Sequence, residues 1–265
     1  MNLLLYVIIF LFGITFGSFL NVCIYRIPKK EDIVKTPSHC MKCGYELKWY
    51  DLVPLFSFIV LKGKCRKCGT KLSLQYPIIE ALNGVMYVFV FARMRINLEA
   101  LFFASSMKDI FPLFDALIIC AFLSVLLVIS VIDFRTYEIP LGCNFFILVL
   151  GILSLILHPQ DLWNRIIGFF AVSLFLLIIY ACTKGRGIGG GDIKLMAVAG
   201  LLLGWKQIIL AFILGCVLGS ILHILRMKIS KADHVLAFGP YLSLGLAIAV
   251  LFGEQILNWY LGFLM

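Results

Sequence analysis

Long apolar runs dominate this chain and restrict what it can fold into. Of its 265 residues, 62% are hydrophobic and only 14% are charged, which is more apolar surface than a water-soluble domain of this size could bury. The runs are long enough for membrane-spanning helices, whereas a membrane barrel would show alternating segments of about ten residues. The sequence therefore predicts an all-α, polytopic membrane protein.

The apolar runs divide into eight predicted transmembrane segments. They cover residues 3–25, 77–95, 110–132, 140–158, 164–182, 192–204, 206–226 and 238–262. The first run is too long for the core of a signal peptide and lacks a small-residue cleavage site, so we expect it to be retained as a span. The sixth run is short for a full crossing, and we expect a tilted or partly inserted helix there.

The basic residues are distributed unequally between the two sides of these segments. Of the 23 Lys and Arg residues, 18 fall on the side of the 26–76 loop. The other five are Arg93, Arg95, Lys108, Arg165 and Lys206. Because basic residues mark the cytoplasmic side, this inequality predicts that the loop is cytoplasmic and that both termini are outside. The same excess of cytoplasmic Lys and Arg accounts for the net charge of +9. Nucleic-acid binding is disfavoured, because it would need a soluble basic domain with an aromatic platform and none is visible in the sequence.

Four cysteines lie in the 26–76 loop as two CxxC pairs. Cys40 and Cys43 form the first pair and Cys65 and Cys68 the second, each followed directly by a glycine. Four thiolates satisfy tetrahedral zinc, and a metal would stabilise a segment too short for much of a hydrophobic core. Structural disulfides are disfavoured in a reducing cytoplasm, and a thioredoxin-like motif would need a βαβ unit. We therefore predict a small zinc-ribbon-like domain with a structural metal.

Two carboxylates end or begin apolar segments at the predicted cytoplasmic face. Asp133 ends the third segment and Asp192 begins the sixth. A charged aspartate at the centre of a membrane helix costs about 2.5–3.5 kcal/mol, so a pair at one depth indicates a joint role. Two adjacent carboxylates can hold a general acid and a general base together, as in aspartic proteases. Proton or ion transport by the same pair is an equally good reading at this point, and Asp192 also occupies a position suited to a helix N-cap.

Five stretches, taken together and in order, resemble the type 4 prepilin peptidases, which are intramembrane aspartic proteases of the GxGD type. They are residues 17–28 (GSFLNVCIYRIP), 76–80 (YPIIE), 133–140 (DFRTYEIP), 189–195 (GGGDIKL) and 238–241 (FGPY). The resemblance extends over nearly the whole chain. One departure is Leu141, which follows Pro140 where many members have an aspartate.

The resemblance implies a bifunctional enzyme. Such enzymes cut the basic leader from prepilins and pseudopilins at the cytoplasmic face of the membrane and then methylate the new N-terminus with S-adenosylmethionine. It implies that Asp133 and Asp192 are catalytic and that Gly63 and Glu80 lie in the region associated with methyl transfer. The corresponding division is a first span at 1–25, a cytoplasmic zinc domain at 26–76 and a peptidase core at 77–265. The expected partners are the substrate and membrane lipid, and no oligomeric state is predicted.

Overall fold

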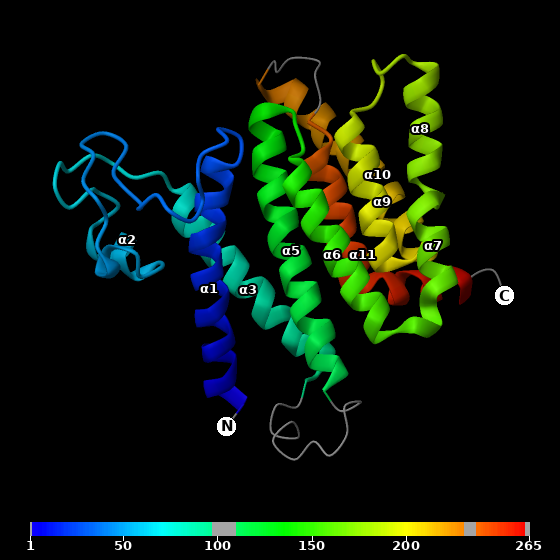
Figure 1. Ribbon diagram of the computed structural model, residues 1–265, viewed down its shortest axis with the longest axis horizontal. Helices are drawn as coiled ribbons and strands as arrows, with labels where there is room; N and C mark the ends of the chain where they lie inside the picture. Colours follow the sequence, from blue (N-terminus) through cyan, green and yellow to red (C-terminus); the bar gives the residue numbers. More distant parts are fainter. Residues whose placement is uncertain (1, 97–109, 231–236, 263–265) are drawn as a thin grey trace. The chain divides into compact units, whose positions relative to one another are not determined.

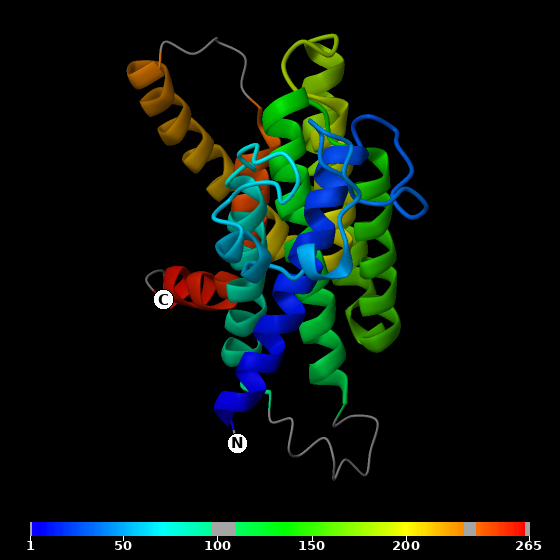
Figure 2. The same cartoon turned by 90° about the vertical axis from the view of Figure 1, so that its left-hand side faces the viewer.

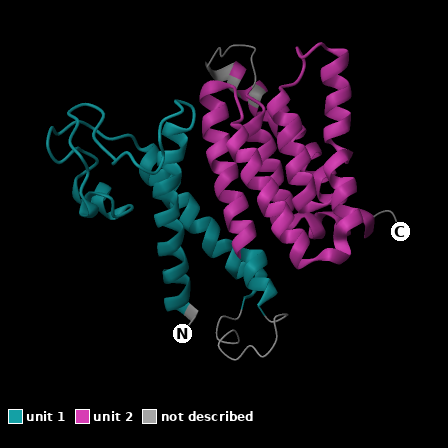
Figure 3. Cartoon of the chain, viewed as in Figure 1, with its two compact units in different colours: residues 1–116 teal, residues 117–265 magenta. Residues whose placement is uncertain are grey.

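A computed structural model describes residues 2–96, 110–230 and 237–262, which are mostly helical apart from a long loop over residues 27–74. Two basic residues counted above, Lys108 and Lys231, lie outside this range. The described chain divides into two compact units, residues 1–116 and 117–265 (Figure 3).

Unit 1 is built on a helical hairpin. Helix α1 (Asn2–Arg26) and helix α3 (Gln75–Met94) lie side by side and run in opposite directions (Figures 1 and 2). Glycines allow the close approach, because a Cβ atom on Gly13 would lie 2.6 Å from Cα of Gly84 and one on Gly17 would lie 2.7 Å from Cα of Glu80. The side-chain amide of Asn83 donates to the carbonyl of Gly13 across this contact. Small residues and buried amides are the usual means of packing helices within lipid.

The loop between these helices is held at its start by Arg26, the last residue of α1. Its buried guanidinium donates to the carbonyl oxygens of Asp32, Thr36 and Pro37. The loop then contains the 3-10 helix η1 (Trp49–Asp51) and the short helix α2 (Phe56–Val60). Arg26, near the end of the 17–28 stretch, therefore shapes the first part of the loop.

Unit 2 is a bundle arranged around helix α9 (Gly190–Leu203), which packs against five of the helices named next, α6, α7, α8, α10 and α11. The other helices are α5 (Phe111–Thr136), α6 (Leu141–Leu157), α7 (Leu162–Ala171), α8 (Ser173–Cys182), α10 (Trp205–Ser230) and α11 (Gly239–Gly262), with a 3-10 turn, η3 (Pro159–Asp161), before α7. The first six residues of α5 belong to unit 1 in the division above. Gly168 of α7 and Gly200 of α9 meet backbone to backbone, so any side chain there would collide.

Each of the eight predicted segments coincides with helix, but eight full spans are not confirmed. Within the described residues, six helical segments are long and apolar enough to cross a membrane by length and composition. Helix α6 has 17 residues and α9 has 14, which at 1.5 Å per residue gives about 26 and 21 Å against a hydrocarbon layer of roughly 30 Å. Pro140 and Pro159 bound α6, and Gly189 and Gly204 bound α9, so local sequence sets their lengths.

Candidate active site and metal centre

Asp133 lies near the end of α5 and is buried, with 5% of the residue exposed. Its Oδ2 accepts a hydrogen bond of 2.9 Å from the backbone N–H of Gly239, the first residue of α11. The N-terminus of a helix favours a negative charge, because its first N–H groups have no partner within the helix. A Cβ atom at Gly239 would lie 2.8 Å from the same Oδ2, so only glycine fits here without displacing the carboxylate.

Asp192 lies in the first turn of α9 and is also buried, with 9% exposed. The N-cap of α9 is Gly189 and not Asp192, so the capping position expected from the sequence is wrong by three residues. The carboxylate of Asp192 instead turns back toward Gly189 and accepts its backbone hydrogen bond. The carboxylate of Asp192 therefore lies at the N-terminus of its own helix, α9, and the carboxylate of Asp133 lies at the N-terminus of the neighbouring helix α11.

The two aspartate motifs meet inside unit 2. Gly191 packs on Ile139, where an added Cβ would lie 3.0 Å from the Ile139 Cβ and 3.5 Å from its backbone nitrogen. Ile139 follows Asp133 by six residues, and Gly191 directly precedes Asp192. The carboxyl groups of Asp133 and Asp192 are close enough for their charges to interact. Segments separated by more than fifty residues thus bring two buried carboxyl groups together.

The far end of α9 is fixed by a buried arginine. Arg165 of α7 donates to the hydroxyl of Ser154 on α6 and to the carbonyl of Leu202 on α9. Asp161, one turn earlier, lies 4.0 Å from the guanidinium. Because an unpaired buried charge is costly, these three partners hold α6, α7 and α9 in one register. The helix that carries Asp192 is therefore fixed at both ends.

The four loop cysteines form a compact cluster within unit 1. The Sγ atoms of Cys40, Cys43, Cys65 and Cys68 all lie within 4.8 Å of one another. The Cys40–Cys68 and Cys43–Cys65 sulfur distances are 3.9 and 4.0 Å, close to the edge of about 3.8 Å expected for a tetrahedron with Zn–S bonds of 2.3 Å. A disulfide needs about 2.05 Å, and the four cysteines are free thiols. The donor set and its spacing fit zinc.

The two cysteine pairs have the same backbone geometry. The amide of Cys40 donates to Tyr45 O and that of Cys65 to Thr70 O, each at 2.8–2.9 Å. The glycines that close the turns, Gly44 and Gly69, have φ of 66° and 67°, a region that favours glycine. This repeated turn directs both thiols of each pair to the same point.

Hydrogen bonds prepare part of this cluster for metal binding. The side chain and backbone of Thr70 lower the pKa of Cys68 to about 6, and backbone amides of Cys43 and Lys42 lower the pKa of Cys40. The pKa of Cys43 is raised to about 11, because burial and hydrogen bonding with the other cysteines outweigh the lowering effect of the Tyr45 amide. Without a cation, a negative charge on one thiolate makes ionisation of the next thiol less favourable. Zinc offsets this repulsion because it binds the thiolate form.

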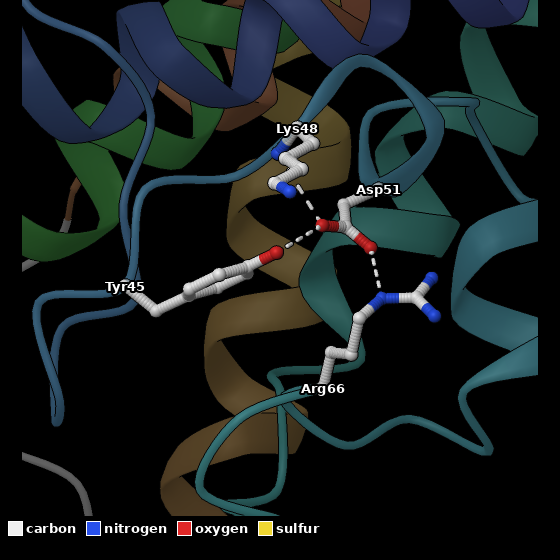
Figure 4. A network of polar contacts seen from close by, with 4 residues as sticks. All are labelled: Tyr45, Lys48, Asp51 and Arg66. Atoms are coloured by element: carbon white, nitrogen blue, oxygen red, sulfur yellow. Dashed lines mark hydrogen bonds and ion pairs between the residues drawn. The ribbon is translucent and has the colours of Figure 1, made fainter.

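A buried aspartate joins the two cysteine pairs (Figure 4). The side chain of Asp51 is only 1% exposed, and its Oδ1 accepts a 2.7 Å bond from Nε of Arg66, which lies inside the second pair. Its Oδ2 is 3.3 Å from the hydroxyl of Tyr45, just after the first pair, and 3.3 Å from the backbone nitrogen of Lys48. Burial alone would raise the pKa of Asp51, but the Arg66 hydrogen bond and charge, with the other donors, lower it overall. No sequence motif marks this residue, which stands out only as an acidic residue in a lysine-rich loop.

Gly63 and Glu80 lie at opposite ends of α2. Glu80 is buried in α3, and its Oε2 accepts a 2.8 Å bond from the amide of Leu55, the N-cap of α2. Gly63 follows α2 with φ of 66°, and a Cβ there would lie 3.0 Å from the ring of Phe58. The contacts explain both residues as supports for α2 without requiring a ligand.

Comparisons with known proteins agree with these motifs. Residues 11–94 match the family described as Bacterial Peptidase A24 N-terminal domain, and residues 120–224 match the Type IV leader peptidase family. A prepilin leader peptidase/N-methyltransferase of Bacillus subtilis is 33% identical over 96% of this chain and 97% of its own length. The chain belongs to the Type IV leader peptidase family. A relative of the same name from Legionella pneumophila is 27% identical over 98% of this chain and 96% of its own, and one from Stutzerimonas stutzeri is 27% identical over 95% and 92%. No solved structure matches.

Membership of a peptidase family gives no support to the transporter reading of the two aspartates. The neighbourhood of the pair also includes two groups whose roles the sequence motifs do not predict. Gly239 belongs to the 238–241 stretch and donates to Asp133, and Ile139 belongs to the 133–140 stretch and packs on Gly191. A Gly-Pro pair at the start of an apolar run was the one available signal for Gly239, because it marks a helix N-terminus with an unpaired amide.

Proposed function

We propose that this chain cleaves the leader peptide of prepilins or pseudopilins and then methylates the new N-terminus. The observation that carries the peptidase half is the meeting of two buried carboxyl groups, Asp133 and Asp192, on separate helices of one unit. The family names of the relatives supply the substrate class and the second activity.

In the proposed cleavage, a water molecule between the carboxyl groups attacks the carbonyl carbon of the scissile peptide. One carboxylate takes a proton from the water while the other carboxyl group donates its proton to the carbonyl oxygen. The tetrahedral intermediate then collapses: the C–N bond breaks, the amine leaves with the proton that the first carboxylate took from water, and the protonated carbonyl oxygen returns its proton to the second carboxylate. The amide of Gly239 keeps the Asp133 carboxylate oriented throughout, and Gly190, where an added Cβ would meet nothing within 4 Å, leaves room before Asp192 for an extended substrate strand.

The charge distribution supports an orientation for this reaction. The 18 basic residues on the loop side favour the cytoplasm, which would place both aspartates and the cysteine cluster at the cytoplasmic face and both termini outside. A prepilin's basic leader would remain on that side, near anionic lipids.

Zinc has a structural role in this proposal. Four cysteine ligands leave no open position, so the metal stabilises the loop and does not activate water. S-adenosylmethionine would supply an electrophilic methyl group to the new amine. Gly63 and Glu80 would contribute by positioning α2, and the buried carboxylate of Glu80 is also suited in charge to a cationic sulfonium group.

The test is cleavage of a prepilin by the purified protein with Asp133→Asn and Asp192→Asn made separately. Each should lose nearly all cleavage, since neither can then exchange the proton. Glu138→Gln is the matched control, because this exposed carboxylate lies five residues from Asp133 and should be dispensable. Near-normal cleavage by either aspartate variant would exclude the dyad. Methylation is measured separately, on a substrate that has already been cleaved.

A further inference from the structure

The loop of unit 1 presents a set of large apolar side chains that the cysteine cluster does not use. Its η1–α2 segment exposes Trp49 (79% exposed), Phe56 (65%) and Ile59 (72%). Leu52, Val53 and Val60 of the same segment are also exposed. We call these six residues the η1–α2 apolar surface. A group of exposed large apolar side chains within one short segment is typical of an interaction site.

This surface lies beside a membrane-capable helix and not beyond its end. Leu55, directly before α2, is hydrogen-bonded to Glu80, five residues inside α3. At 1.5 Å per residue this bond lies about 8 Å along the helix from its start. Figure 1 agrees, because α2 is drawn level with the hairpin and below the points where the loop leaves α1 and enters α3. The η1–α2 segment therefore folds back alongside α3, toward the part of that helix that would lie within the bilayer.

Contacts at two points hold the surface in this position. Leu55 has φ of 60°, an uncommon conformation for a leucine, and the Glu80 carboxylate accepts its amide. At the other end of the segment, Asp51 of η1 is bonded to Arg66 beside the metal ligands. Trp49 and α2 are thus fixed to a membrane helix and to the cysteine cluster.

Three exposed lysines flank the surface in the sequence. Lys48 directly precedes Trp49, and Lys62 and Lys64 follow α2, and all three are exposed. Tryptophan is enriched at the headgroup level of membranes, and lysines nearby are attracted to anionic lipids. Apolar side chains flanked by lysines are the composition of interfacial segments.

We propose that the η1–α2 apolar surface docks into the headgroup layer of the membrane that α1 and α3 cross. Trp49, Phe56 and Ile59 enter the boundary between headgroups and acyl chains, and Lys48, Lys62 and Lys64 contact anionic lipid phosphates. The occupant is the lipid bilayer, since the surface is continuous with helices that already lie in it. The proposal does not depend on peptidase or methyltransferase activity.

The experiment measures the depth of Trp49 in vesicles. Trp163, Trp205 and Trp259 are replaced by phenylalanine, so that Trp49 is the remaining tryptophan, and the protein is reconstituted in equal parts of phosphatidylcholine and phosphatidylglycerol. Docking predicts that lipids brominated near the headgroup end of the acyl chain quench most Trp49 fluorescence. Lipids brominated near the chain terminus should quench less, and iodide in the water should quench little.

Two variants in this background test the surface itself. Phe56→Ser with Ile59→Ser should restore iodide quenching and remove most bromolipid quenching, while bound zinc is unchanged. Val34→Ser is the control, because Val34 is 89% exposed in the same loop but outside the surface, and it should change neither. If the double variant loses zinc, the proposal is judged from the quenching profile of the single-tryptophan parent protein. Iodide quenching equal to that of free tryptophan would overturn the proposal, and so would shielding from both quenchers, which would mean that protein covers the surface.

Discussion

Replacing Gly239 by alanine tests how the Asp133 carboxylate is held. The added Cβ would lie 2.8 Å from Oδ2 and 2.9 Å from Cγ of Asp133, against ordinary contacts of 3.4 Å or more. The carboxylate must therefore move by roughly half an ångström, which would weaken its 2.9 Å hydrogen bond from the residue 239 amide. Because φ of Gly239 is not positive, alanine suits the backbone and the effect is confined to this contact.

The expected loss follows from that hydrogen bond. A bond to a charged group contributes about 1.5–3 kcal/mol, and each 1.4 kcal/mol corresponds to tenfold in rate. We expect kcat/KM for prepilin cleavage to fall by about ten- to hundredfold in Gly239→Ala. The assay is the gel shift or mass change of a purified prepilin with time, at matched enzyme concentration and zinc content.

Gly142→Ala is the matched control for this prediction. Gly142 lies in the first turn of α6, close in sequence to the Asp133 motif, and a Cβ there would meet nothing within 4 Å. Its cleavage rate should equal that of the parent protein. If Gly239→Ala also cleaves within about twofold of the parent, a difference of about 0.4 kcal/mol, the amide of Gly239 does not position the carboxylate.

Three further changes concern unit 1. Asp51→Asn should speed zinc release to a chelator by about tenfold at neutral pH, since it weakens a buried charge-assisted bond to Arg66. The pKa of Asp51 is lower in the folded protein than in the unfolded chain, so the ionised carboxylate stabilises the fold fully above the unfolded-state pKa. This stabilisation is lost as pH falls through the folded-state pKa, and the ratio of variant to parent zinc-release rates should therefore approach one in acid. Glu80→Gln keeps an acceptor for the Leu55 amide and should retain methylation of a cleaved substrate, whereas Glu80→Leu should lose it; equal loss in both would show that the charge itself is required. Gly63→Ala, with φ of 66°, should lower the midpoint of thermal zinc release by an amount equivalent to about 1 kcal/mol or more, and an unchanged midpoint would contradict the strain argument.

The helical segments were the most predictable part of the fold. Hydrocarbon thickness demands long apolar runs, so each predicted segment coincides with helix in the described residues. Lengths were less predictable. Proline and glycine at the ends of α6 and α9 shorten those helices, and the number of segments that satisfy the length for a span falls to six.

The metal cluster was predictable for a local reason. Each CxxC pair is a short turn closed by a glycine, and both turns adopt the same hydrogen-bond pattern. What joins the turns is not local. Asp51 contacts Tyr45 and Arg66 from a third point of the loop, and its spacing follows no motif that a sequence pattern could reveal.

The helices, the four cysteines and the two aspartates at the ends of apolar runs can be predicted from the sequence, because these features depend on hydropathy and short spacings. The groups that surround each aspartate could be identified only in the folded protein. The amide of Gly239 reaches Asp133 from 106 residues away, and Gly191 meets Ile139 through the packing of helices that small residues allow. Such contacts depend on how helices pack against one another, and that packing reflects the shape of whole helix faces instead of the residues next to either aspartate.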